Sequence, residues 1–248
     1  MEYSVQLNNL GVQCLDTGCD QHFIMSLFNE SLHENLLNMT GRPSALTSSE
    51  QKNRIDQTMI EIRQAEFRPR NQQQRRISWC GSFVYTKAIL LVMPEKNDLI
   101  PDDMELSEDD VSITTAVTSA IILYNLGLIN HLIGFSLGQA DQVYTRKARK
   151  LYEMAFSLVS DALDIDAKTV GSPIVIASLN NLGQINQEIG RFDLSKECFE
   201  KLSKILLAMA LTAENVVNNQ NVLVSESDWA GLLFNAMIFQ NEMGAPAA

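Results

Sequence analysis

Three side chains near the amino terminus are of the types used in nucleophilic catalysis. Cys14, His22 and Asp16 could form a nucleophile, a base and an acid, because Cys and His that are apart in sequence can meet in space. Cys14, however, follows Leu10 by four residues on an apolar stripe, where cysteine acts as a small core residue. The chain also has no phosphate-binding loop, dinucleotide fingerprint or HExxH motif. We therefore expect no catalytic residues and no enzyme activity.

The other cysteines and histidines favour neither a metal site nor a disulfide framework. The four cysteines are scattered without a CxxC pair, and the three histidines form no motif with them. Cofactors and metals are accordingly not expected.

Composition and charge restrict the classes of partner. The 248 residues are 46% hydrophobic and 20% charged, which is typical of a globular protein, and the net charge is −11. An acidic chain repels nucleic-acid backbones and anionic membranes. No secretory signal is visible, and the uninterrupted apolar runs are far shorter than the roughly 20 residues that span a bilayer. We expect a cytoplasmic protein without nucleic-acid or membrane partners.

A short pattern recurs three times along the chain. Residues 7–11, 123–127 and 179–183 each end in Leu-Gly, and at the same further spacing they are followed by Gly18, Gly134 and Gly190. The residues between have the three- and four-residue spacing of an amphipathic helix, and the later Gly is expected to end it as a left-handed cap.

A second helix with an aromatic residue among mostly small residues follows each of the first ones. Phe28, Tyr152 and Phe199 hold this position. A small residue lets two helices approach, and the aromatic ring fills the space beside it. The repeating unit is therefore predicted to be a helical hairpin, whose apolar face needs neighbouring units to cover it.

This unit resembles the tetratricopeptide repeat, and the Asn-Asn-Leu-Gly opening is similar to repeats of the kinesin light chain type. The third unit is the best match, although it carries Asn186 where the family usually has an aromatic residue and Ser195 and Leu202 where it usually has Ala. The resemblance implies an all-α protein, an α-solenoid of tetratricopeptide-like helical hairpins.

Asn9, Asn125 and Asn181 occupy the same position in the three units, one residue before the inward-facing Leu. In families of this kind the first helices line a concave groove, where an Asn carboxamide can hold the main chain of an extended peptide. The alternative is that these Asn residues bond to the neighbouring helix and fix the repeat geometry, and the two roles can coexist. The predicted partner-binding set also includes Gln184, Glu188 and His131, with a packing role as the alternative for His131.

The long stretch between the first and second units is a predicted insert. It contains a possible helix with Ile55, Met59 and Ile62, an Arg-rich stretch at 68–76, two segments at 83–85 and 89–93 of extended character, and an acidic run. The Arg-rich stretch invites a nucleic-acid or phosphate role, but the net charge of the chain opposes it and a solvated loop is favoured. Arg75-Arg76-Ile77-Ser78 also resembles a basophilic kinase site, which makes Ser78 a possible phosphosite; a chance match of a short string is the alternative.

The predicted organisation is a first hairpin at 1–37, the partly extended insert at 38–112, a second hairpin at 113–164, a third at 173–220 and a C-terminal capping helix at 226–243. We expect a non-enzymatic scaffold or adaptor that binds a protein or peptide in its groove. Two alternatives stay open: a regulatory or catalytic activity in the insert, and a self-assembling, homo-oligomeric structural protein. We also expect Asn125→Ala with Asn181→Ala to weaken partner binding and leave the thermal midpoint nearly unchanged.

Overall fold

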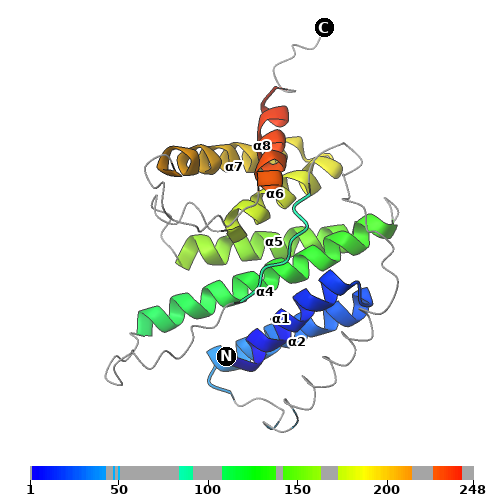
Figure 1. Ribbon diagram of the computed structural model, residues 1–248, viewed down its shortest axis with the longest axis vertical. Helices are drawn as coiled ribbons and strands as arrows, with labels where there is room; N and C mark the ends of the chain where they lie inside the picture. The colour runs from blue at the N-terminus through cyan, green and yellow to red at the C-terminus, as the bar shows by residue number, and fades with distance from the viewer. Residues whose placement is uncertain are drawn as a thin grey trace. The chain divides into compact units, whose positions relative to one another are not determined.

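Helices make up nearly all of the described chain (Figure 1). The computed structural model describes residues 2–42, 47, 50, 84–91, 108–137, 142–162, 173–213 and 226–241. The helices are α1 (Glu2–Thr17), α2 (Gln21–Met39), α4 (Glu108–Leu137), α5 (Gln142–Ala162), α6 (Pro173–Glu188), α7 (Phe192–Ala213) and α8 (Glu226–Asn241). Since none of these residues forms a strand, the predicted all-α class is confirmed for the part of the chain described.

The chain divides into two compact units. The first comprises Met1–Asn71 with Ala88–Ala162, and the second comprises Gln72–Lys87 with Leu163–Ala248. In the first unit α1 packs on α2, α4 packs on α5, and α4 also contacts α1 and α2. In the second unit α7 packs on both α6 and α8.

A glycine faces an aromatic ring where the helices of each hairpin meet. A Cβ atom built on Gly11 would lie 2.6 Å from the Phe28 ring, and one built on Gly183 would lie 2.6 Å from the Phe199 ring. At Gly127 the corresponding distance to the Tyr152 ring is 3.0 Å. The rings thus occupy the space that any larger residue would need at these glycines.

The turn glycines behave as predicted in two of the three cases. Gly18 and Gly190 both have a φ of 77°, the left-handed conformation that ends α1 and follows α6. The prediction for Gly134 is wrong, because α4 continues through it to Leu137. Gly134 serves a close approach instead: its Cβ would lie 2.8 Å from Thr145 Oγ1.

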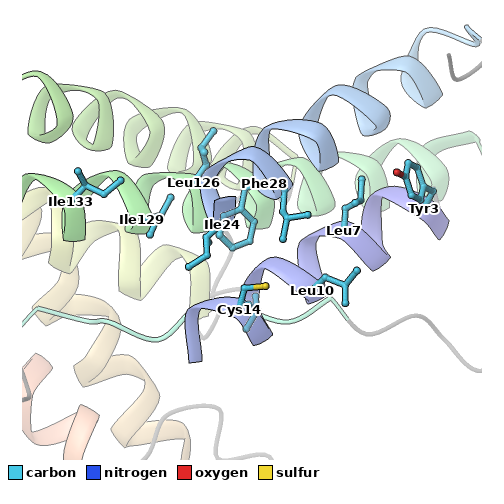
Figure 2. Packing of buried hydrophobic residues seen from close by; sticks show 11 residues of the cluster. Tyr3, Leu7, Leu10, Cys14, Ile24, Phe28, Leu126, Ile129 and Ile133 are labelled. Carbon is cyan, nitrogen blue, oxygen red and sulfur yellow. The ribbon is translucent and has the colours of Figure 1, made fainter. Parts of the chain in front are cut away.

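The core of the first unit joins α1, α2 and α4 (Figure 2). Cys14 is fully buried in it, so its predicted role as a core residue is confirmed. The buried residues drawn in Figure 2 include Tyr3, Leu7, Leu10, Ile24, Phe28, Leu126, Ile129 and Ile133.

α4 is more apolar than the sequence analysis recognised. Ile113–Leu137 is long enough to cross a membrane, and its most apolar 18-residue window has a mean hydropathy of 1.6. The count of uninterrupted apolar runs missed it because Thr, Ser, Asn and Gly break the runs without adding charge. Of its most apolar 18-residue window, 78% is buried inside the protein, which is also the property of a core helix.

Candidate functional site

Asn125 binds the main chain of Ile89 with both ends of its carboxamide. Its Oδ1 accepts a hydrogen bond from the Ile89 N–H (2.8 Å), and its Nδ2 donates to the Ile89 carbonyl oxygen (2.8 Å). Asn125 is fully buried, so these bonds satisfy a side chain that would otherwise be costly to bury. The contact therefore involves only the main-chain N–H and C=O of Ile89 and not its side chain.

Asn9 makes the same contact two residues further along. Its Oδ1 accepts from the Leu91 N–H (2.8 Å), and its Nδ2 donates to the Leu91 carbonyl oxygen (2.7 Å). Both groups of Ile89 and of Leu91 therefore point toward Asn side chains. In an extended backbone every second residue turns its N–H and C=O to the same side. Residues 88–91 are thus bound as a single extended segment, part of the teal coil in Figure 1; it is called the strand below, although it pairs with no other described strand.

The second unit contains an equivalent contact. Asn181 Oδ1 accepts from the Tyr85 N–H and its Nδ2 donates to the Tyr85 carbonyl oxygen, both at 3.0 Å. The Tyr85 side chain is buried. This burial raises the pKa of its phenol to about 12, and the negative charge of Asp228 contributes a smaller part of the rise. Lys87 forms an ion pair with Asp228 of α8.

A second layer of Asn residues holds the first. Asn8 donates from Nδ2 to Asn9 Oδ1 (3.2 Å), and Asn180 likewise donates to Asn181 Oδ1 (3.1 Å). Asn8 also receives a bond from a neighbouring helix, since Asn125 donates to Asn8 Oδ1 (2.9 Å). The carboxamides that face the strand are therefore fixed in orientation before anything binds them.

Asn235 of α8 completes this pattern, and the sequence analysis missed it. It is fully buried and donates to Asn180 Oδ1 (2.7 Å), as Asn125 does to Asn8. Its neighbourhood, Phe234-Asn235-Ala236, resembles Tyr124-Asn125-Leu126, with an aromatic residue before the Asn and an apolar residue after it. This signal could have found it, but α8 lacks the Leu-Gly pair by which the other units were aligned.

The other predicted partner-binding residues lie in different surroundings. His131 is only 2% exposed and meets the Tyr152 ring edge-on, with 6.0 Å between ring centres, so it packs between α4 and α5 and does not face a partner. Burial lowers its pKa to about 4. Gln184 is fully buried in α6. Glu188 is exposed at the end of α6, yet desolvation by nearby protein raises its pKa to about 7.

Several expectations fall outside the described residues. These are Ser78, the Arg-rich stretch at 68–76, the helix expected around Ile55, Met59 and Ile62, and the acidic run as far as Ser107. Within the residues that are described, no group of three or more His, Cys, Asp or Glu side chains could hold a metal ion.

Comparison with models of known protein families, with curated proteins and with solved structures finds no match. The geometry of the Asn residues therefore carries the functional argument alone.

Proposed function

We propose that the protein is a non-enzymatic cytoplasmic scaffold that binds an extended segment of a partner protein through Asn9, Asn125 and Asn181. The observation that supports this is the pair of hydrogen bonds that each of the three makes to one main-chain residue. A carboxamide that faces an extended chain in this way matches the repeating donor and acceptor of any peptide. Binding of this type needs no cofactor.

The tetratricopeptide-like array belongs to the same proposal. Each of the hairpins α1–α2, α4–α5 and α6–α7 pairs a glycine in its first helix with an aromatic residue in its second. In every case the main-chain-binding Asn stands two residues before that glycine, which is expected of units that repeat one geometry. Each of these hairpins would then present one Asn to a peptide.

Capture of partners by matched variants tests the proposal. Asn125→Ala removes both bonds to an extended main chain, whereas Asn29→Ala changes an exposed Asn that bonds only within α2. We expect a partner recovered by the wild type and by Asn29→Ala to be lost from Asn125→Ala, after circular dichroism shows that all three are folded. The captured protein, truncated to its shortest binding segment, should bind purified wild type. Equal recovery by Asn125→Ala and Asn29→Ala would contradict the proposal.

A further inference from the structure

The Asn9 and Asn125 site already has an occupant, and that occupant is the protein's own chain. The hydrogen bonds described above to Asn9 and Asn125, with a longer one from Asn8 Nδ2 to the Ile89 carbonyl (3.3 Å), connect residues 88–91 to the helices of the first unit. A partner segment of the proposed kind needs the same carboxamides. It can reach them only if these residues leave.

These residues are less deeply buried than the helices that hold them. Leu90 is 52% exposed, Ala88 and Ile89 are half-buried and only Leu91 is buried, whereas Asn125 and its helical neighbours from Ala120 to Asn130 are all buried. The Leu90 N–H makes no hydrogen bond to any described residue. Segments with few buried contacts open at lower free energy than the core. Residues 88–91 can therefore open at a lower free energy than the helix that holds Asn125.

We propose that residues 88–91 are an internal ligand that closes the Asn9 and Asn125 site and is displaced by an extended partner segment. This inference rests on the proposed function, whose binding site it shares. Once the strand leaves, Asn9 and Asn125 lose their four bonds to its main chain, and only a ligand with N–H and C=O groups at two-residue spacing restores all four. The partner is thus an extended peptide without proline at either of two positions two residues apart.

The site is suited to exchange of one strand for another. Asn125 keeps its bond to Asn8 whatever the occupant, and Asn8 keeps Asn9 in orientation. A preorganised site costs less to fill. Because the internal strand is tethered, its effective concentration is in the range of about millimolar. The apparent Kd of a competing peptide equals its intrinsic Kd divided by the fraction of molecules that are open.

Two proline variants separate closure from other effects of the segment. Ile89→Pro removes the N–H that Asn125 accepts, and Leu90→Pro removes an N–H that bonds to none of the described residues. Proline at 90 also leaves Ile89 in the extended region it already needs. The probe is a fluorescent synthetic peptide with the sequence of residues 84–91, followed by two lysines for solubility, and its binding is measured by anisotropy.

We expect Ile89→Pro to bind the probe about tenfold to hundredfold more tightly than wild type, and Leu90→Pro to bind as wild type does. Adding Asn125→Ala to Ile89→Pro should abolish the gain, as should an N-methyl group on the probe residue that corresponds to Ile89. Equal binding by wild type and Ile89→Pro overturns closure. If Asn125→Ala nevertheless loses the captured partner, the scaffold function stands and only closure is wrong.

Amide hydrogen exchange of the wild type decides the matter if Ile89→Pro fails to fold. A displaceable strand exposes the Ile89 and Leu91 amides by local opening, so they should exchange faster than the α4 amides near Asn125 and with little dependence on added urea. Exchange of these two amides only together with the α4 core, with the full urea dependence of unfolding, overturns the proposal.

Discussion

Asn235 donates a hydrogen bond to Asn180 across 2.7 Å, and both side chains are fully buried. Asn180 in turn orients Asn181, which holds the main chain of Tyr85. The hydrogen bond from α8 therefore influences the main chain of Tyr85 through the carboxamides of Asn180 and Asn181. α8 was predicted only as a capping helix, but it also orients the carboxamides that bind Tyr85.

Asn235→Ala should destabilise the second unit by about 1 to 3 kcal/mol, because it leaves the Asn180 carbonyl oxygen buried without this donor. Urea unfolding measures the loss, and exchange of the Tyr85 amide should become faster. Asn29→Ala, at an exposed position, should change stability by less than about 0.5 kcal/mol. A Tyr85 amide that exchanges at the wild-type rate would show that Asn235 does not act on the strand.

Asn125→Ala should lower the free energy of unfolding by about 1 to 3 kcal/mol. This differs from the sequence-based expectation of an unchanged thermal midpoint, which treated the Asn residues as facing an absent ligand. Asn125 has three bonds to its own chain, two to Ile89 and one to Asn8. Asn9→Ala should cost less, since Asn9 is only half-buried. Differential scanning calorimetry of both variants checks the order.

Gly183→Ala should destabilise the α6–α7 hairpin, because the new methyl group would lie 2.6 Å from the Phe199 ring. The overlap costs about 1 to 3 kcal/mol, reduced by the roughly 1 kcal/mol that Ala gains over Gly in a helix. A double-mutant cycle with Phe199→Leu tests the cause: the pair should lose less stability than the sum of the single losses. Additive losses would mean that the methyl group and the ring do not compete for space.

The stability of the first unit should depend on pH through His131. Its folded pKa of about 4 lies below the ordinary 6.5, so the unfolded chain binds more protons in this range. The stabilisation is complete above pH 6.5 and is lost as the pH falls toward 4, by about 2 to 3 kcal/mol. Glu188, with a raised pKa, shifts stability in the opposite direction. Urea unfolding at about pH 7 and about pH 4.5 should therefore be compared between wild type and His131→Phe, which should lack this loss.

The sequence predicted the helices well because their signals are local. Apolar residues at three- and four-residue steps, such as Leu179, Leu182 and Ile185 in α6, need only the period of one helix. The ability of Asn125 to bind a main chain could also be predicted, since a carboxamide offers one donor group and one acceptor. The segment that it binds could not be predicted. Asn side chains bind the main chain, so residues 84–91 carry no complementary side-chain pattern that would identify them.

Gly134 shows that the end of a helix is harder to predict from the sequence than the helix itself. Its spacing from the preceding Leu-Gly pair equals that of Gly18 and Gly190, but of the three only those two adopt a positive φ. Whether a helix ends at a glycine depends on the contacts of the next few residues, and here the packing of Thr145 against Gly134 favours a continued helix. Such a contact depends on the length of the connection between α4 and α5, which the aligned motif does not contain.

Because the Asn residues bind only the main chain, these contacts do not restrict the amino-acid sequence of residues 85–91 to particular side chains. At positions 85, 89 and 91 the Asn residues bind the same N–H and C=O whatever side chain is attached. Every amino acid except proline keeps both groups, and proline lacks the donor. Exposed positions of this segment, such as Leu90, can therefore change during evolution while the contact persists, so the asparagines should stay recognisable longer than the sequence of the segment they hold.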